Sequence, residues 1–298
     1  MKRLVLAVVI SGIIFLKINS LQAKIMMWEI GKGNNVVYLL GSIHVMPEDA
    51  YPLDEQIEAA FEKSDLLVVE LDPGKIDQNE LNDLIVNSAF YPDGTSLKSE
   101  IPTELYNPVI EKFQELGMPE AQVNQFRPWF VALNLGMGAL QKLEINSATG
   151  IDIHFLNKAH EKQLTILEME TPTAQMEVLS SMQDSTQIDY LQYVVEDYDN
   201  VKEDFMKLLS AWEAGDADKV NKLYRIKLKE LASELPGMKE YYQKLLPDRD
   251  KQMADQIKGF LESEEGHTYF VIAGVIHLVG KDGILQLLKD EGYSADQF

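Results

Sequence analysis

The stretch YLLGSIH at positions 38–44 has a close counterpart near the other end of the chain, FVIAGVIH at positions 270–277. Each stretch consists of an apolar run, a glycine, two further residues and a histidine. The apolar runs predict buried β-strands, and the glycine permits an abrupt turn where the strand ends. We therefore expect His44 and His277 just past the carboxyl ends of strands, the edge at which open α/β sheets bind ligands.

Two more apolar runs complete the expected sheet. The predicted strands are Val36–Leu40, Leu66–Glu70, Leu164–Glu168 and Tyr269–Ala273. Their nearly unbroken apolar character is typical of a sheet covered on both faces. A helical pattern over Leu53–Lys63 separates the first two strands, which predicts a right-handed βαβ unit with those strands as parallel neighbours.

Helical patterns fill most of the remaining chain. They cover Thr103–Leu116, Pro128–Leu143, Lys281–Asp290 and a long charged tract, Thr173–Leu261. The sequence therefore predicts an α/β fold, a mostly parallel or mixed central sheet with flanking helices and a large helical insertion at about 173–261. We expect this insertion to pack beside or over the strand edge and to shape substrate entry.

The first 23 residues have the pattern of a signal peptide. A basic start is followed by the apolar stretch Leu4–Leu16 and by Ala23 at the expected cut. The apolar stretch is shorter than the roughly 20 residues of a membrane span. We expect a secreted or periplasmic protein, one domain over 24–298 and no stable membrane span after cleavage. A retained anchor or a buried first helix is the alternative.

Composition excludes several classes of function. The chain has no cysteine, which rules out disulfides, a lipid-modified cysteine and a cysteine nucleophile. Its formal net charge of −21 repels phosphate backbones, so nucleic acid is not an expected partner. A peptide or a small molecule fits better as the substrate. Serine hydrolysis is disfavoured too, because no Gly-x-Ser-x-Gly motif is present.

Carboxylates follow the other two expected strands. Glu70 ends the second strand and Glu168 the third. Parallel strands would bring these groups to one edge with His44 and His277. Two imidazoles and a carboxylate are a common ligand set for zinc or a similar divalent cation. Two satisfied core histidines and ordinary surface acids are the alternative, which the repeated motif disfavours. Metal binding should weaken as the pH falls through the ordinary pKa of histidine, about 6.5.

Three carboxylates are weaker candidates for substrate binding or for supporting the ligands. Asp152 lies near a helix start and would either face the site or cap the helix. Asp72 precedes Pro73-Gly74 and would either support the site or belong to that turn. Glu168 would face the site or orient one of the ligands.

The sequence resembles the TraB/GumN family, whose animal relatives are the Tiki metalloproteases. The resemblance extends from about Trp28 to Tyr293 and rests on several short pieces. These are Gly41–His44, Val69–Asp72, Thr149–Asp152, Leu167–Glu168, Arg249, Gly274–Gly280 and Gly292–Tyr293. In one departure, Asp250 follows the arginine where family members often have asparagine, which changes the charge there.

The resemblance implies a metal-dependent hydrolytic site in a fold related to the erythromycin-esterase group. It makes His44, Glu70 and His277 metal ligands or catalytic groups and gives Arg249 a supporting role. We expect a metal-dependent, protease-like hydrolase of peptide or amide-like bonds in the cell envelope, with zinc, manganese or cobalt as the divalent ion. Glu70 would be a ligand or the general base, and Arg249 would stabilise the oxyanion.

Binding without turnover is the alternative function. Relatives of this fold class include a haem-binding lipoprotein, so the same edge could hold a metal or haem. Relatives that inhibit pheromones suggest a protein that sequesters a small peptide.

Overall fold

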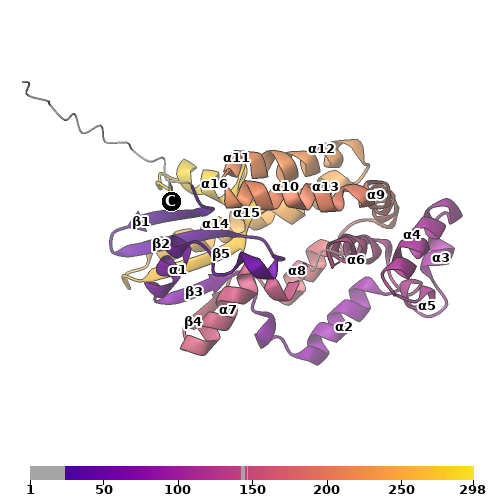
Figure 1. Cartoon of the computed structure of the whole chain (residues 1–298), viewed down its shortest axis with the longest axis horizontal. Coiled ribbons are helices and arrows are strands. Elements are labelled where there is room, and N and C mark those ends of the chain that lie inside the picture. The colour runs from indigo at the N-terminus through magenta and orange to yellow at the C-terminus, as the bar shows by residue number, and fades with distance from the viewer. Residues whose placement is uncertain (1–23, 142–144, 146) are drawn as a thin grey trace, which may run out of the picture.

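The computed structural model describes residues 24–141, 145 and 147–298, so the expected signal peptide lies outside the described residues. A six-stranded mixed sheet forms one end of an elongated molecule and a group of helices forms the other (Figure 1). The sheet order is β4-β3-β5-β2-β1-β6. Its strands are β1 Met27–Lys32, β2 Asn35–Ser42, β3 Leu66–Val69, β4 Thr165–Glu168, β5 Thr268–Gly274 and β6 Asp296–Gln297.

The four expected strands are confirmed as β2, β3, β4 and β5, and they run parallel to one another. One expectation about them was wrong. The first two, β2 and β3, are not neighbours, because β5 lies between them and pairs with both. The run from Tyr269 to Gly274 is entirely buried, so it suits the central position, while the partly exposed β4 forms an edge. Two strands were not predicted, β1, which pairs antiparallel with β2, and the short β6.

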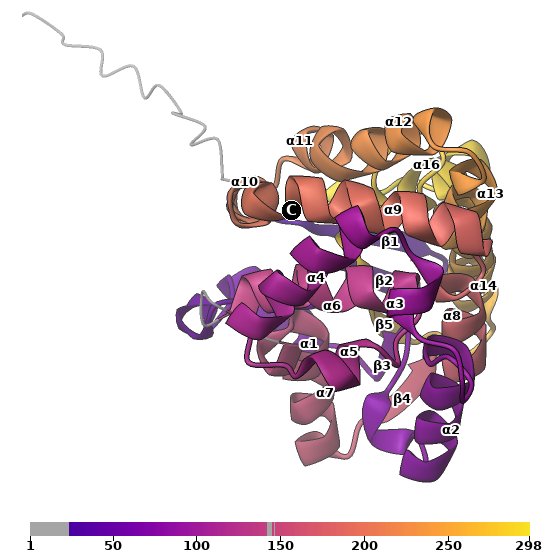
Figure 2. The ribbon, with the colours of Figure 1, turned by 90° about the vertical axis from the view of Figure 1, so that its right-hand side faces the viewer.

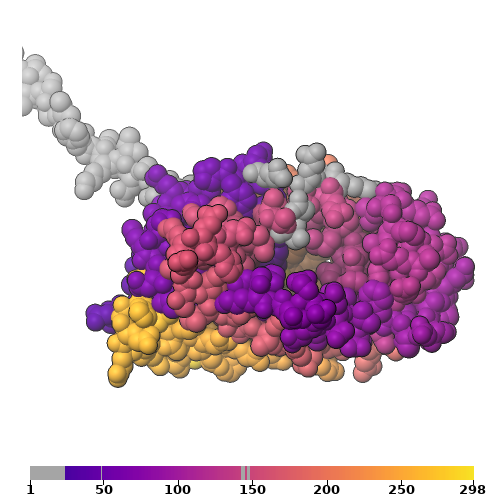
Figure 3. All heavy atoms as spheres, turned by 90° about the horizontal axis from the view of Figure 1, so that it is seen from below, coloured from indigo at the N-terminus to yellow at the C-terminus, as the bar shows by residue number. Residues whose placement is uncertain are grey.

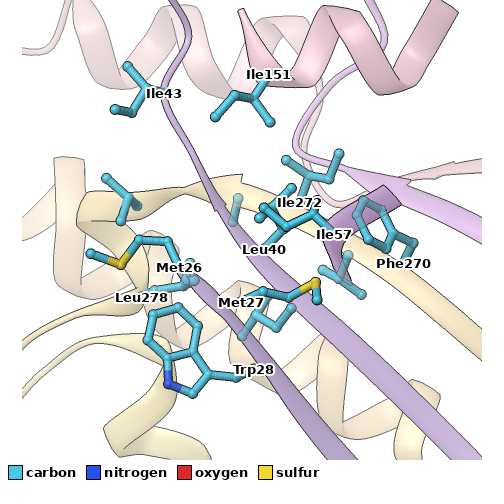
Figure 4. Close-up of a cluster of buried hydrophobic side chains, with 14 of the residues drawn as sticks. Met26, Met27, Trp28, Leu40, Ile43, Ile57, Ile151, Phe270, Ile272 and Leu278 are labelled. Atoms are coloured by element: carbon cyan, nitrogen blue, oxygen red, sulfur yellow. The ribbon is translucent and has the colours of Figure 1, made fainter. Parts of the chain in front are cut away.

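Both faces of the sheet are covered, as the apolar strands predicted. On one face Phe270 of β5 contacts Phe61 of α1 and Phe155 of α7, with ring centroids 5.4 and 4.9 Å apart. On the other face Tyr269 stacks on Phe260 of α14. Figure 4 shows the apolar side chains of the strands and adjoining segments packed into one core around β2 and β5.

The helices account for most of the described chain. The α-helices are α1 Glu55–Glu62, α2 Gln78–Ala89, α3 Leu97–Glu100, α4 Thr103–Glu115, α5 Glu120–Val123, α6 Pro128–Gln141, α7 Ile151–Lys162, α8 Pro172–Leu179, α9 Asp184–Asp197, α10 Val201–Glu213, α11 Ala217–Val220, α12 Lys227–Glu234, α13 Met238–Gln243, α14 Arg249–Glu262, α15 Val275–Leu278 and α16 Ile284–Asp290. The π-helical turns are η5 Asn221–Ile226 and η6 Lys244–Asp248, and the 3₁₀ turns are η1 Glu48–Ala50, η2 Pro73–Lys75, η3 Ser147–Thr149 and η4 Tyr198–Asn200.

The helical end of the molecule is built from two parts of the chain, of which the sequence identified one as an insertion. Helices α2–α6, between β3 and β4, pack with α8, α9, α12 and α13, which follow β4. Figure 2 views the molecule from this end and shows α4, α6 and α9 in front of the sheet. Three helices of the expected insertion, α10, α11 and α14, instead bury their apolar side chains in the core around the sheet. No helix in the described part of the chain has the length and apolarity that a membrane span requires.

Candidate functional site

His44 lies two residues beyond β2 and is held by the start of α7. Its Nδ1 is 2.8 Å from Asp152 Oδ2, and the Ser42 hydroxyl donates to Asp152 Oδ1 at 2.9 Å. Helix α7 can approach because residue 150 is glycine. A Cβ there would lie 2.4 Å from the carbonyl oxygen of His44. Asp152 therefore orients the His44 ring, whereas the backbone of Gly150 occupies the capping position.

The Asp152 carboxylate changes the titration of His44. It raises the pKa of His44 to about 9 from an ordinary 6.5, although partial desolvation of the ring by neighbouring atoms acts in the opposite direction. Burial also opposes ionisation of Asp152, but the His44 imidazolium and the Ser42 hydroxyl keep the pKa of Asp152 below its usual value. The range near 6.5 that we expected for the site histidines is too low for His44 in this structure, because the sequence made Asp152 a candidate for the site but did not show its pairing with His44.

His277 lies in α15, directly after β5, and its support is fully buried. Its Nδ1 is 2.6 Å from Asp250 Oδ1, and Asp250 is 0% exposed. The second oxygen of Asp250 is 2.6 Å from Arg225 Nη1, which also donates to the carbonyl of Ile276 at 3.1 Å. Asp250, noted in the sequence as a change of local charge, therefore holds His277. Arg225 was missed, because an arginine in a charged helical tract carries no distinguishing signal.

Glu70 follows β3 and is bound on both of its oxygens. Oε1 accepts a hydrogen bond from the Gly274 amide at 2.6 Å, and Oε2 is 2.9 Å from Arg249 Nη2. Arg249 also donates to both oxygens of Glu170, each at 2.7 Å, and to the carbonyl of Leu245 at 3.3 Å. Burial opposes ionisation of Glu170, but the bonds from Arg249 lower its pKa. The guanidinium therefore joins two buried carboxylates.

The three principal residues converge at Gly274, the last residue of the central strand. A Cβ at that position would lie 3.3 Å from Glu70 Oε1, 3.4 Å from His277 Cδ2 and 3.5 Å from His44 Nε2. Both imidazoles therefore approach one point with the ring edge that carries or adjoins Nε2, while a carboxylate holds each Nδ1. We expected β2 and β3 to be neighbours, but the three residues still converge with β5 between those strands. In the observed order, β5 places His277 between the strands that lead to His44 and Glu70.

The chemical types of the groups at this point, two imidazoles and a carboxylate, are those that bind a divalent cation. Histidines that bind metals usually donate their other ring nitrogen to a carboxylate, as both imidazoles are placed to do here. The arrangement is nevertheless incomplete, since no three His, Cys, Asp or Glu side chains in the described residues are gathered closely enough to hold an ion. Glu70 is instead bound to Arg249 and the Gly274 amide.

Asp72 and Glu168 have other partners in the structure. Asp72 Oδ1 accepts a hydrogen bond from the Gly74 amide at 3.0 Å, which is the turn role considered from the sequence. Its other oxygen is 3.1 Å from His160 Nε2. Glu168 accepts a bond from the Asp72 amide at 2.8 Å. Glu170, two residues beyond Glu168, is the carboxylate that reaches Arg249, and we did not select it from the sequence.

A cavity of about 500 Å³ opens onto His44 and Glu70. Ile153 and Leu156 of α7 contribute apolar lining, and Pro73 and Gln175 come from η2 and α8. In the view from below, the molecule is hollowed between α2 and α7 (Figure 3). His44, Glu70 and Asp152 therefore border a space of the size of ordinary ligand pockets, about 300–1,000 Å³.

Comparisons with known proteins agree on one family. The model of the TraB/PrgY/gumN family matches residues 26–297. The uncharacterized protein YbaP of Escherichia coli (strain K12) is 23% identical over 259 residues, covering 86% of this chain and 89% of its own length. The protein of the same name from Shigella flexneri is similar to the same extent. No solved structure matches significantly.

Proposed function

The chain belongs to the TraB/PrgY/gumN family, and from this premise we propose that it is a metal-dependent hydrolase of peptide or amide-like bonds, secreted or periplasmic in the cell envelope. One observation carries the proposal. Two imidazoles from different strand ends approach the same point beside Glu70, and each has a carboxylate at its Nδ1. Carboxylates that hold the second ring nitrogen in this way are usual for histidines that bind a metal, and His44 and Glu70 of this group line the cavity.

His44, His277 and Glu70 would hold a divalent cation such as zinc, manganese or cobalt. When bound, such an ion lowers the pKa of a water ligand and polarises a scissile carbonyl. The protein orients the donors for this role. Asp152 fixes the His44 ring and Asp250 fixes the His277 ring. The cavity beside His44 and Glu70 would receive the substrate.

We assign Arg249 a positioning role in place of the expected oxyanion contact. Bonds to Glu70, to both oxygens of Glu170 and to the carbonyl of Leu245 engage four of the five N–H groups of its guanidinium. A guanidinium held in this way has little donor capacity left for a substrate. It instead keeps Glu70 Oε2 away from the point near Gly274, so that Oε1 faces it.

Binding of a peptide without turnover is the second candidate function. The observation that favours it is the lack, among the described side chains, of a preassembled group of three metal donors. Turnover distinguishes the two functions.

A library of short peptides, incubated with protein stripped of metal by a chelator, is the direct test. We expect cleavage after manganese, cobalt or zinc is added and none while the chelator is in excess, because the ion supplies the activated water. Mass spectrometry identifies the products. Tight binding of peptides with no product in any metal would establish the second candidate and overturn the first.

Gly274→Ala is the matched variant for this assay. The backbone of Gly274, at φ −51° and ψ 131°, accepts alanine, and the added methyl would occupy the point between Glu70, His277 and His44. We expect turnover to fall by at least about 100-fold, with a change in the free energy of unfolding near the lower end of the roughly 1–3 kcal/mol typical of overpacking. Gly259→Ala, at an exposed helical position with no atom within 4 Å, is the control.

The pH dependence of metal binding should follow His44. Its pKa of about 9 means that a cation must displace a proton at neutral pH, so affinity should rise with pH and level off above about 9. Calorimetric titrations in buffers of different ionisation enthalpy count the protons released. Asp152→Asn removes the charge that raises the pKa and should move the rise toward 6.5. An affinity that is constant between pH 7 and pH 9 would contradict this assignment.

The same shift affects stability. Because the folded pKa of His44 lies above its ordinary 6.5, the His44–Asp152 pair stabilises the fold fully below pH 6.5. This contribution is lost as the pH rises through about 9. Solvent screens the pair, since 63% of the His44 side chain is exposed, so the effect on stability should be small.

A further inference from the structure

A second cavity, of about 410 Å³, lies among the helices at the helical end of the molecule. Helices α6, α9, α12 and α13 contribute to its walls, together with the turns η5 and η6. Its lining is mainly apolar and includes Leu133, Leu223, Leu228 and Leu245. His44, Glu70 and His277 do not line this cavity.

Four tyrosines are among the lining residues of this apolar cavity. Tyr190, Tyr193, Tyr224 and Tyr241 all line it. Burial raises the pKa of Tyr224 to about 12 and also raises the pKa of Tyr190 and Tyr241. These hydroxyls are therefore neutral at physiological pH. They can bond to an amide or a carbonyl without placing a charge in the cavity.

The inner wall of the cavity is linked to the hydrolytic site through the backbone of two lining residues. Ile276, which lines the cavity, directly precedes His277, and its carbonyl accepts a bond from Arg225. Leu245, also in the lining, accepts a bond from Arg249 through its carbonyl. The two arginines that support the site thus also fix the backbone of the cavity wall. A ligand that contacts Ile276 in the cavity would lie one residue along α15 from His277.

The lining charges discriminate between apolar ligands. Lys227 lies 3.4 Å from Asp197 and 2.7 Å from Asp204, and all three line the cavity. Two carboxylates against one ammonium leave a net negative charge. This charge repels the carboxylate of a fatty acid and tolerates a neutral or cationic peptide. The tyrosine hydroxyls likewise suit a ligand with amide groups better than a hydrocarbon chain.

The geometry points to this cavity as the specificity pocket of the site, which takes a large apolar side chain of a neutral or cationic peptide. The inference rests on the proposed function for the identity of the occupant as a substrate. The cavity volume is within the range of about 300–1,000 Å³ that ligand pockets span. The side chain in the pocket would belong to a residue near the bond presented to His277.

Gly136 of α6 offers a way to fill the cavity. It lines the space, and a Cβ added there would have no atom within 4 Å. Gly136→Leu should therefore occupy the cavity without a clash at its Cβ, and it replaces a poor helix former by a good one. Gly259→Leu is the matched control, since Gly259 is helical, exposed, equally free of neighbours and absent from the cavity lining.

The experiment measures binding of the neutral fluorescent probe N-phenyl-1-naphthylamine to the full chain. We expect Gly136→Leu to weaken probe binding at least about tenfold, and Gly259→Leu to leave it unchanged. Neutral pentapeptides with a central Phe or Leu should displace the probe, and the same peptides with a central Glu should not. Equal probe binding by wild type and Gly136→Leu would overturn the proposal, as would displacement by palmitate but not by the apolar peptides.

His44→Ala separates failure of this proposal from failure of the proposed function. The variant lacks a residue of the hydrolytic site but leaves the cavity lining intact. Peptides that displace the probe from both wild type and His44→Ala, with no cleavage by wild type, would support the pocket and contradict the hydrolase. Cleavage by wild type with no preference for apolar residues, unchanged in Gly136→Leu, would support the hydrolase and contradict the pocket.

Discussion

Replacing His44 with alanine is expected to abolish turnover and to weaken binding of a divalent cation by more than the about 10–100-fold that loss of an outer partner causes. The side chain offers its Nε2 to the point beside Gly274, so the change removes a donor outright. The fold should tolerate the loss, because 63% of the side chain is exposed and Asp152 keeps its bond from Ser42. Calorimetric metal titration and urea unfolding of the same preparation measure the two effects separately.

His277→Ala is the companion variant, for which we expect a larger loss of stability beside the loss of metal affinity. It should lose the same metal affinity and turnover, but it also leaves buried Asp250 without one of its partners. We expect about 1–3 kcal/mol of destabilisation from that unpaired acceptor. If wild type and both variants bind metal equally, neither histidine is a ligand and the assignment is wrong.

Replacing Asp250 with alanine should be the most destabilising of these changes. Asp250 is fully buried and is the ion-pair partner of Arg225, whose side chain is 4% exposed. Removal of one partner of a buried pair leaves an uncompensated charge and costs about 3–5 kcal/mol. His277 would lose the acceptor at its Nδ1 as well. Urea unfolding should give the loss of stability, and the metal titration should weaken in parallel.

Asp250→Asn separates the charge from the hydrogen bond. Asparagine keeps the size of the side chain and an oxygen that can accept from His277 Nδ1, so we expect a smaller loss of stability than with alanine and retention of metal binding. A loss of stability below about 1 kcal/mol with alanine would show that Arg225 and His277 find other partners, contrary to the arrangement described.

The parts of the fold that the sequence predicted are those that local pattern determines. An apolar run followed by glycine and histidine specifies a strand, its end and a side chain just beyond it, and β2 and β5 agree with that prediction. The order of the strands depends on contacts between distant segments. The pattern of one strand does not encode them, so the position of β5 between β2 and β3 was missed.

The same distinction applies to the site. The structure brings His44, His277 and Glu70 together as expected, because each follows a parallel strand. Of their supports, Asp152 and Arg249 were selected from the sequence, whereas the charges of Asp250 and Arg225 resemble ordinary surface charges of helices. Arg225 and Asp250 become a buried pair only when η5, α14 and α15 pack together.

The strand pattern predicted that a carboxylate follows β4, but it did not distinguish Glu168 from Glu170 as the one that joins the site. Both carboxylates follow the same apolar run. Glu168 is the last residue of β4 and accepts from the Asp72 amide, whereas Glu170 lies beyond the strand, where Arg249 reaches it. Only the position of α14 decides which carboxylate joins the site, and the sequence alone does not supply that position.

The most direct test of the account is the position of a metal ion in crystals grown with cobalt or manganese, located by anomalous diffraction. The account predicts one strong peak beside Gly274, bonded to Nε2 of His44, Nε2 of His277 and Glu70, at the roughly 2.0–2.2 Å usual for metal bonds to these donors. Crystals that contain the metal at saturating concentration and show no peak between the two imidazoles, or that show it only at other residues, would contradict the metal site and the hydrolase built on it.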